Sequence, residues 1–426
     1  MKLSDIIEEW ISGDWGSEQS STEAAEKVYC LRSADISPIY HSTFDTAAVR
    51  YISAHSLSRN QLKEGDIVIE KSGGTNNCST GRVILITKDI LAKNTPLVCS
   101  NFCAAFRVKE KWDSAFVYYY FRLIHRSGVF LNFEGKTSGI HNLLIDLAFS
   151  TIEFPNIDLP TQKRIASVLS NIDRKIALNR AMNEELEAMA RQLYDYWFLQ
   201  FDFPDANGKP YRSWGGKMVY NDILKREIPQ GWEVGKVANI CQPNKRTSNG
   251  KFDAPFQYLD TSSITENHIE ELQKLDPSVD NIPSRARRLI TEGDIVYSTV
   301  RPNLKHYGLL YNPIGNMVVS TGFAVLTSNW SGYRYYLYQF LSHPEIVNKL
   351  HTIAQLSVSA YPSISANDIL DLDILVPSKD IVNKYAEFCN NVYSQMDIQE
   401  KEILHLTKLR DELLPLLMNG QVTIKE

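Results

Sequence analysis

Two long segments of the chain carry apolar residues at the spacing of one face of an α-helix. They follow Pro155 and Pro377, and we expect long helices over 159–200 and 379–420. One heptad frame fits both segments. In the first segment, position a holds Ile165, Ile172, Leu186 and Leu193, and position d holds Val168, Met182, Met189 and Tyr196. In the second segment, position a holds Tyr385, Val392, Leu406 and Leu413, and position d holds Leu409 and Leu416.

The apolar faces predict that the two helices pack on each other. An isolated helix of this length would leave its apolar stripe in water, so a coiled coil is favoured. Asn179 and Gln399 put a polar amide at equivalent a positions of the two helices. A buried amide of this kind fixes the register of a coiled coil.

The segments before the two helices repeat each other. Glu64–Val68 recurs as Glu292–Val296, and in both copies a turn glycine precedes a β-branched run that predicts a buried strand. Further strands are expected near 82–87 and 308–311, and helices near 114–126 and 332–350. Tandem repeats related by a pseudo-two-fold axis make the long helices antiparallel. The predicted fold class is therefore α/β, with two similar mixed α/β globules in tandem pseudo-repeat, separated by two long antiparallel α-helices forming a coiled coil.

Composition limits the class of protein. The chain has 426 residues, enough for two or three domains, and 22% charged residues, as expected of a globular protein. The six cysteines are scattered without the paired spacing of a metal site, so we expect free, reduced thiols. No apolar run is long enough to span a membrane, and the first residues do not resemble a signal peptide, so a cytoplasmic location is expected.

The long helix and the segment after it resemble the specificity subunits of type I restriction-modification enzymes. The resemblance is densest in LPTQKRIA (159–166), LYDYWF (193–198), FDFP (201–204), NGKPY (207–211) and IPQGW (228–232). It continues in LRDELLPLL (409–417) and NGQ (419–421) of the second long helix and the segment after it. It implies target recognition domains at 1–158 and 229–378, spacer helices at 159–200 and 379–420, and a linker at 201–228.

The resemblance also implies a function and partners. It implies a non-catalytic subunit in which each recognition domain reads one half of a bipartite, asymmetric site in double-stranded DNA. The helices would set the spacer and dock two methyltransferase subunits, and two restriction subunits would complete a defence against foreign DNA. S-adenosylmethionine, ATP and Mg²⁺ would belong to the partner subunits, with no cofactor in this chain.

Sequence motifs for chemistry within the chain are missing. Its Pro-Asn and Asn-Pro pairs lack the second proline of an adenine methyltransferase box. Gly73-Gly74-Thr75-Asn76-Asn77 lacks the lysine and spacing of a phosphate-binding loop. Glu134-Gly135-Lys136 and Asp173-Arg174-Lys175 are the nearest matches to a nuclease motif, and solvated charges explain them better. We expect no catalytic residues and no metal site.

Loops at equivalent places in the two halves are candidates for DNA contact, because cations bind phosphates while polar side chains read base edges. The candidates are Lys71, Ser72, Thr75, Asn76, Asn77, Lys136, Thr137, Ser138, Lys245, Arg246, Arg301, Asn303, Lys305, Ser359 and Tyr361. An ordinary polar turn is as good an interpretation for any one of them. The candidates for the coiled coil or subunit docking are Ile165, Ile172, Asn179, Leu186, Leu193, Trp197, Val392, Gln399, Leu406 and Leu413. Trp197 and the neighbouring phenylalanines are more typical of a helix end seated on the second globule than of a docking surface.

One alternative stays open, a protein-interaction scaffold that presents two related heads on a rigid helical rod. The net charge of −5 favours it, because DNA-binding proteins are usually basic. A DNA reader with this charge needs partner subunits for much of its phosphate contact. We therefore expect weak DNA binding by the chain alone and tight, specific binding by the complex.

Overall fold

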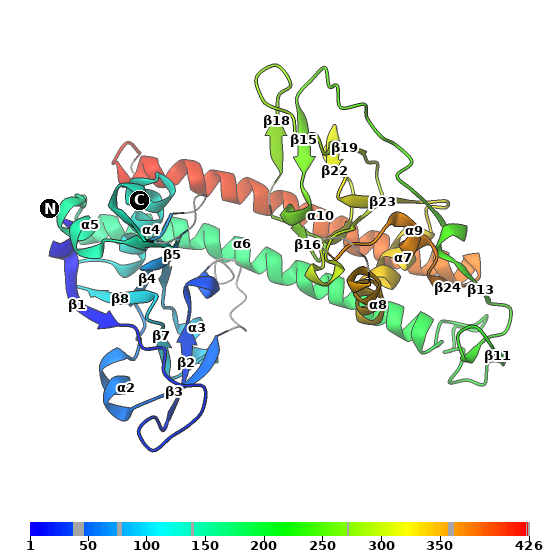
Figure 1. The fold of residues 1–426 in the computed structure, drawn as a ribbon, viewed down its shortest axis with the longest axis horizontal. Coiled ribbons are helices and arrows are strands. Elements are labelled where there is room, and N and C mark those ends of the chain that lie inside the picture. Colours follow the sequence, from blue (N-terminus) through cyan, green and yellow to red (C-terminus); the bar gives the residue numbers. More distant parts are fainter. Residues whose placement is uncertain are drawn as a thin grey trace. The chain divides into compact units, whose positions relative to one another are not determined.

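The structure, a computed structural model, describes residues 1–36, 47–74, 79–137, 140–270, 272–356, 362–422 and 424. The chain divides into two compact units (Figure 1). The first comprises Met1–Ala181 and Glu400–Glu426, and the second comprises Met182–Gln399. Each unit therefore contains one globule together with a stretch of each long helix, α6 (Leu159–Tyr194) and α10 (Lys379–Met418).

The first unit is built on small sheets covered by helices. Its four-stranded antiparallel sheet has the order β1 (Ile7–Ser12), β8 (Cys103–Val108), β4 (Ile67–Glu70) and β6 (Val83–Leu85). Two three-stranded sheets accompany it: β3 (Ala48–Ile52), β2 (Glu26–Leu31) and β7 (Leu97–Cys99), and β5 (Ser72–Gly74), β10 (Ile140–Leu143) and β9 (Glu134–Thr137). The helices of this globule are α2 (Ala54–Asn60), α3 (Lys88–Lys93), α4 (Ser114–Arg126) and α5 (Ile145–Thr151).

The second unit repeats this plan. Its sheet β14 (Cys241–Pro243), β23 (Phe323–Ser328), β20 (Ile295–Ser298) and β21 (Tyr307–Leu309) has the same order and directions as β1-β8-β4-β6. A second sheet contains β18 (Gln273–Leu275), β15 (Phe256–Leu259), β22 (Met317–Ser320) and β19 (Ala286–Leu289). Shorter pairs are β11 (Met218–Asn221) with β12 (Arg226–Pro229), β13 (Glu233–Lys236) with β24 (Asp373–Val376), and β16 (Ile264–Thr265) with β17 (His268–Ile269). The strands β4 and β20 are those predicted from the repeated glycine turn.

The helix predicted over 332–350 is wrong in its bounds. The structure has α7 (Tyr333–Ser342) and α8 (Pro344–Gln355), separated at His343. Proline disfavours the helical conformation of the residue before it, and His343 has the extended angles φ −64° and ψ 135°. The short helix α9 (Ala366–Leu370) follows α8.

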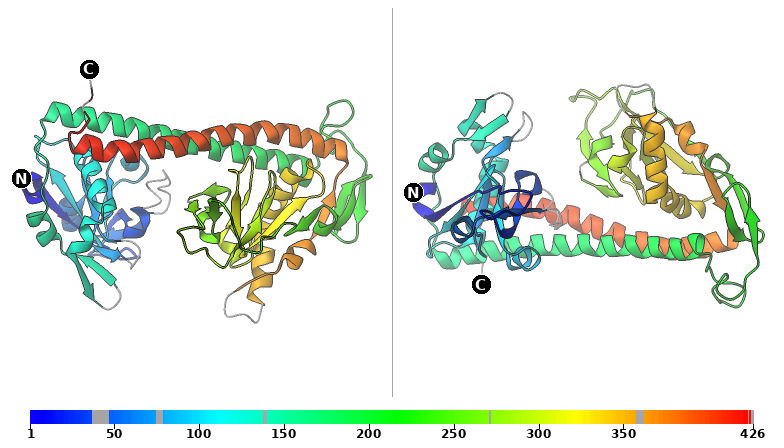
Figure 2. Two further views of the ribbon diagram at one scale, coloured as in Figure 1. Left: turned by 90° about the horizontal axis from the view of Figure 1, so that it is seen from above. Right: turned by 60° about the horizontal axis from the view of Figure 1, so that its bottom comes forward.

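The long helices are antiparallel within each unit, as predicted, and lie side by side (Figure 2). In the first unit Asp173 contacts Arg410 and Asn179 contacts Glu402, so the residue numbers run in opposite directions. In the second unit Glu187 contacts Tyr393, and the Tyr385 hydroxyl donates to the carbonyl of Ala190.

The predicted heptad frame is correct at position a and only partly correct at position d, where Val168, Leu409 and Leu416 are half-buried. Ile165, Asn179, Val392 and Gln399 are buried, and Ile172, Leu186, Leu193, Leu406 and Leu413 are half-buried. Met182, Met189 and Tyr196, assigned to position d, are exposed. The second buried line lies one residue further along, at Leu169, Ile176, Ala190, Cys389, Ile403 and Leu417. Residues three and four positions after a face the same side of a helix, and apolar side chains occupy both.

The globule of each unit packs on its stretch of the helix pair. In the first unit Phe106, Phe116 and Phe121 share one core with Leu169 of α6 and Leu417 of α10. In the second unit Phe198, Phe201 and Phe203 pack with Trp232, while Trp197 lies against Tyr385. The aromatic residues at the end of α6 therefore seat this helix on the second globule, as predicted.

The cysteine thiols of the described residues are buried and free, as expected from their scattered positions. Five cysteines lie in the described residues, and all five are buried and free: Cys30, Cys99, Cys103, Cys241 and Cys389. Among the described helices, none is long and apolar enough to cross a membrane.

Candidate nucleic-acid interface

In the first unit the two candidate loops meet. The segment after β4 becomes β5, which pairs with β10. The backbone N–H of Leu143 donates to the carbonyl of Lys71 at 2.8 Å. The Ser72 hydroxyl donates to Asn142 Oδ1 at 2.5 Å. Two stretches that are about 70 residues apart in the sequence therefore form one surface.

In the second unit the equivalent loops meet in the same way. The N–H of Ile364 donates to the carbonyl of Thr299 at 2.8 Å, and that of Arg301 to the carbonyl of Pro362 at 3.0 Å. Val300 and Ser363 form an antiparallel bridge. The pairing of candidate loops is thus a repeated feature of the fold, although the loop sequences differ.

The turn before the neighbouring strand, β8 in the first unit and β23 in the second, forms the third part of each surface. The N–H of Lys71 donates to the carbonyl of Phe102 at 2.8 Å, and the N–H of Thr299 donates to the carbonyl of Gly322 at 2.8 Å. Phe102 and Gly322 precede β8 and β23, which occupy the same position in their sheets. Phe102 is an exposed aromatic side chain beside the first candidate loop. No sequence pattern marks Phe102 as part of the interface.

A buried ion pair supports the first loop. Glu70, at the end of β4, is fully buried, and Arg82 binds it through Nε (2.9 Å) and Nη2 (2.6 Å). Gly73 has φ 135°, and a Cβ there would lie 2.8 Å from Glu70 Oε1. The loop needs glycine at this point because its backbone passes directly over the carboxylate.

A second polar group supports the β9–β10 hairpin. Glu134 accepts hydrogen bonds from the N–H (2.7 Å) and hydroxyl (2.9 Å) of Thr80, and His141 Nδ1 lies 2.8 Å from its other oxygen. Burial opposes ionisation of Glu134, but the bonds from Thr80 and His141 outweigh it and lower the pKa of the carboxyl. The carboxylate therefore ties both ends of the hairpin to the segment that precedes β6.

The second unit's loop turns sharply at two cations. Arg301 and Lys305 have left-handed backbones, with φ 49° and 57°, on either side of the short 3₁₀ turn Pro302–Leu304. Asn303 between them is exposed. Lys305 Nζ contacts Glu266 Oε1 at 2.7 Å, which leaves about half of its side chain exposed. Arg301 and Asn303 therefore present polar groups on the outer side of this turn.

The two cations of the basic loop at 245–249 lie in different surroundings. Lys245 is exposed. Arg246 Nη2 lies 3.4 Å from Asp294 Oδ2 and also donates to the Thr291 hydroxyl. Asp294 belongs to the repeated glycine-turn segment and is buried, and its counterpart Asp66 is bound by Arg107. Arg246 thus supplies the cation that Arg107 supplies in the first unit.

Several candidates lie outside the described residues: Thr75, Asn76, Asn77, Ser138, Ser359 and Tyr361. Lys136 and Thr137 lie on β9, and their side chains are outside the described set.

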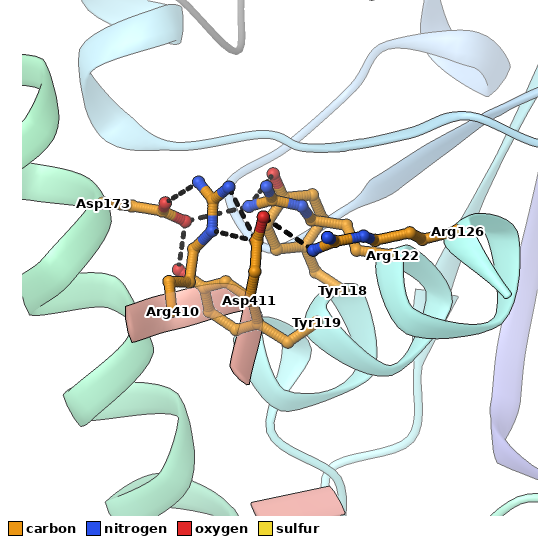
Figure 3. Close-up of polar contacts among 7 residues, drawn as sticks. All are labelled: Tyr118, Tyr119, Arg122, Arg126, Asp173, Arg410 and Asp411. Atoms are coloured by element: carbon orange, nitrogen blue, oxygen red, sulfur yellow. Dashed lines mark hydrogen bonds and ion pairs between the residues drawn. The ribbon is translucent and has the colours of Figure 1, made fainter. Parts of the chain in front are cut away.

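A charged cluster joins the first globule to the helix pair (Figure 3). Asp173 of α6 accepts hydrogen bonds from Tyr119 (2.7 Å) and Arg122 (2.9 Å) of α4 and from Arg410 (2.8 Å) of α10. Burial disfavours the charged carboxylate, but Arg122 and Arg410 outweigh it and lower the pKa of Asp173. Arg126 extends the cluster through Asp411 at 2.6 Å.

The corresponding contact in the second unit is mainly aromatic. Tyr335, Tyr338 and Tyr393 lie together, and Glu187 of α6 accepts hydrogen bonds from Tyr393 (3.1 Å) and Gln339 (3.2 Å). Burial raises the pKa of Glu187. One globule is thus held by ion pairs and the other by tyrosines around one carboxylate.

Comparisons with known proteins agree with this architecture. Residues 1–188 match the family described as Type I restriction modification DNA specificity domain. The MjaIX specificity subunit of Methanocaldococcus jannaschii is 24% identical over 344 residues, covering 79% of this chain and 75% of that protein. The HindI specificity subunit of Haemophilus influenzae is 20% identical over 435 residues, covering 86% and 88%. The chain is therefore similar to type I restriction-modification specificity subunits over most of its length.

The fold of the chain also matches a solved structure. The S subunit of the type I system from M. genitalium aligns over 98% of this chain and 95% of its own, with a TM-score of 0.50 and 14% identity. The likeness covers both units, so the repeated architecture is a property of the fold.

Proposed function

We propose that each unit of this specificity subunit reads one half of a bipartite, asymmetric site in double-stranded DNA. The observation that carries the proposal is the pairing of candidate loops at equivalent places in the two units, through Lys71 with Leu143 and Thr299 with Ile364. The scaffold of the two surfaces is the same while their side chains differ. Two readers of this kind suit a site with two different halves.

In this proposal, residues 1–158 and 229–378 recognise DNA. Residues 159–200 and 379–420 set the spacing of the two half-sites and dock the partner subunits, and 201–228 is a linker. The proposed partners are two methyltransferase subunits and two restriction subunits. The seam residues of the helices face each other within each unit, so partners must use other faces. Met182 and Met189 of α6 and Tyr196 in the π-helical turn that follows it are exposed and seven residues apart, which suits a further helix laid along this face.

Co-expression with the candidate methyltransferase subunit tests the proposal. N6-methyladenine would be mapped by single-molecule sequencing with the wild-type chain, without it, and with 1–158 or 229–378 exchanged for a relative's segment. We expect a split motif in which each exchange changes one half only. An active methyltransferase whose motif does not depend on this chain would overturn the proposal and favour the scaffold alternative.

A further inference from the structure

A loop and a strand of the second unit form a continuous basic surface, here called the basic ribbon, which comprises 245–251 and 285–288. The N–H of Ser248 donates to the carbonyl of Arg287 at 2.7 Å, and the N–H of Leu289 donates to the carbonyl of Arg246 at 3.1 Å. Thr247 and Arg288 form an antiparallel bridge. The loop is therefore an added edge of β19, and its cations lie beside those of the strand.

The ribbon carries six cations and no acidic residue: Lys245, Arg246, Lys251, Arg285, Arg287 and Arg288. Arg246 is engaged with Asp294. Within the described residues the other five have no carboxylate partner. In a chain of net charge −5, this concentration of uncompensated positive charge is a local exception.

Two of the arginines are held in place by bonds that use only part of their donor capacity. Arg287 Nε donates to the carbonyl of Ser284 at 3.0 Å, and Nη1 donates to the carbonyl of Asn249. Arg288 Nη1 donates to the Thr247 hydroxyl at 3.1 Å. A guanidinium has five N–H donors, so each retains several for a further acceptor.

The local backbone accommodates this arrangement. A Cβ at Gly250 would lie 2.3 Å from Arg287 Nη1, and Gly250 has φ 85°. The pairing of β19 with β22 is irregular between Ala286 and Arg288. A bulge of this kind interrupts the strand's alternation, and the adjacent Arg287 and Arg288 are both half-buried instead of alternating between faces.

The basic ribbon is hydrogen-bonded to the turn that also binds the second unit's candidate DNA-contact loop, the loop after β20 that begins at Thr299; this loop and the one after β4 are here called the reading loops. The N–H of Thr321 donates to the carbonyl of Arg285 at 2.9 Å, and the next residue, Gly322, accepts from the N–H of Thr299 at 2.8 Å. The repeat places 57–60 of the first unit, part of α2, at the position of 285–288. Among these residues Arg59 is the only cation, so 57–60 lacks the three arginines that 285–288 carries.

We propose that the basic ribbon binds backbone phosphates of the DNA whose bases the second unit reads. This inference rests on the proposed function. Positioned guanidinium groups that lack carboxylate partners fit phosphate oxygens, and phosphate contacts orient a protein on DNA without reading its sequence. The two units then differ in how they hold DNA. The second contributes the phosphate contacts of the ribbon, and the first has no counterpart of these arginines at 57–60.

The test uses the complex of the full chain with its methyltransferase subunit. DNA affinity would be measured by fluorescence anisotropy across a KCl series, on a duplex with the methylated motif and on one with a scrambled motif. The variant R285Q/R287Q/R288Q removes three cations of the ribbon, and K27Q/K88Q/K93Q removes three exposed lysines of the first unit as the matched control.

We expect the ribbon variant to bind both duplexes about 10-fold more weakly at 0.1 M salt, with a salt-dependence exponent lower by two to three. The ratio of specific to scrambled affinity and the methylated motif stay unchanged. The control variant changes the exponent by less than about 0.5. The single variant R285Q loses no described side-chain hydrogen bond. It should show about one third of the change in the salt-dependence exponent, which distinguishes an effect of lost charge from an effect of impaired folding.

Two results would overturn the inference. An unchanged exponent in the ribbon variant, while the wild-type complex discriminates the two duplexes, rejects the phosphate site and leaves the proposed function standing. Loss of methyltransferase from the complex on gel filtration would instead assign the ribbon to an acidic face of that subunit. If the wild-type complex does not discriminate the duplexes, the proposed function itself fails.

Discussion

Asn179 Nδ2 donates a hydrogen bond to Glu402 Oε2 at 2.8 Å, from α6 to α10 within the first unit. Asn179 is buried, and Lys175 Nζ approaches the same carboxylate at 3.3 Å. The hydrogen bond from Asn179 and the charge of Lys175 lower the pKa of Glu402. The polar break in the apolar seam therefore has a specific partner on the opposite helix, which a shifted register would lose.

The substitution Asn179→Leu should keep the fold and relax the register. Leucine fills the seam, and Glu402 stays accessible to water and to Lys175, so the melting temperature should change by no more than about 3 °C. Methylation by the complex should then tolerate half-site spacings one base pair longer or shorter. Single-molecule sequencing of a spacer library measures this, with Leu186→Met as a control within the same seam. An unchanged spacing preference would show that the amide does not set the register.

The substitution Asp173→Asn should destabilise the first unit by about 3 kcal/mol at pH 7. It leaves Arg122 and Arg410 partly buried without their shared carboxylate. Urea denaturation followed by tryptophan fluorescence measures the loss, and Glu184→Gln, an exposed residue of α6, is the control.

The same substitution predicts a pH dependence. Because the pKa of Asp173 is lowered in the folded chain, the unfolded chain takes up this proton first as the pH falls. The stability from the ionised carboxylate is fully present above about pH 4 and is lost below it. The gap between wild type and Asp173→Asn should shrink as the pH falls from 5 towards 3. A gap independent of pH would mean that packing, not charge, explains the loss.

The substitution Glu187→Gln should stabilise the second unit at neutral pH by about 1 kcal/mol. Burial raises the pKa of Glu187, and its Oε2 has no hydrogen-bond partner within the described residues. A raised pKa means that ionisation costs more in the folded chain, so the stability of wild type should fall as the pH rises from 5 to 8. The variant should lose this slope in thermal melts, whereas Glu185→Gln should keep it.

The substitution Gly73→Ala should impair one half of the site only. The new Cβ would meet the buried Glu70 carboxylate at a positive φ, with an expected cost of about 1–2 kcal/mol in stability. The methylated motif should lose discrimination in the half assigned to the first unit and keep it in the other. Gly208→Ala, in an open turn of the linker at φ 74°, strains the backbone without touching either loop. Equal effects on both halves would contradict the assignment.

The repeated elements were predictable because they depend on local pattern. The glycine turns before β4 and β20, the helix α4 and the two long helices follow from spacing alone. The heptad frame failed at Met182 and Met189 because these exposed side chains are as apolar as the residues that are buried. Only the position of the partner helix decides which of two adjacent lines becomes the seam. The break at His343 was readable from Pro344, a local signal that the helical pattern concealed.

The position of the candidate interface could be predicted from the sequence, whereas most of its hydrogen bonds and ion pairs could not. The sequence indicated loops after β4 and β20, but not that each is bonded to a second candidate loop. Arg246 lies in a short basic loop and was therefore a candidate DNA contact. Its partner Asp294 lies 48 residues away in the sequence, so the ion pair could not be predicted from the loop. Arg285, Arg287 and Arg288 carried a signal of their own, three arginines within four residues, that no motif marked as a site.

The bonds that fix the two reading loops run from main chain to main chain: Leu143 to Lys71, Ile364 to Thr299, and both loops to the turn before the neighbouring strand. Such bonds do not depend on which side chain a residue carries, so most loop positions are replaceable without loss of the frame. Under the proposed function, a new DNA preference can then arise by substitution in one unit while the fold, the helices and recognition of the other half-site stay as they are.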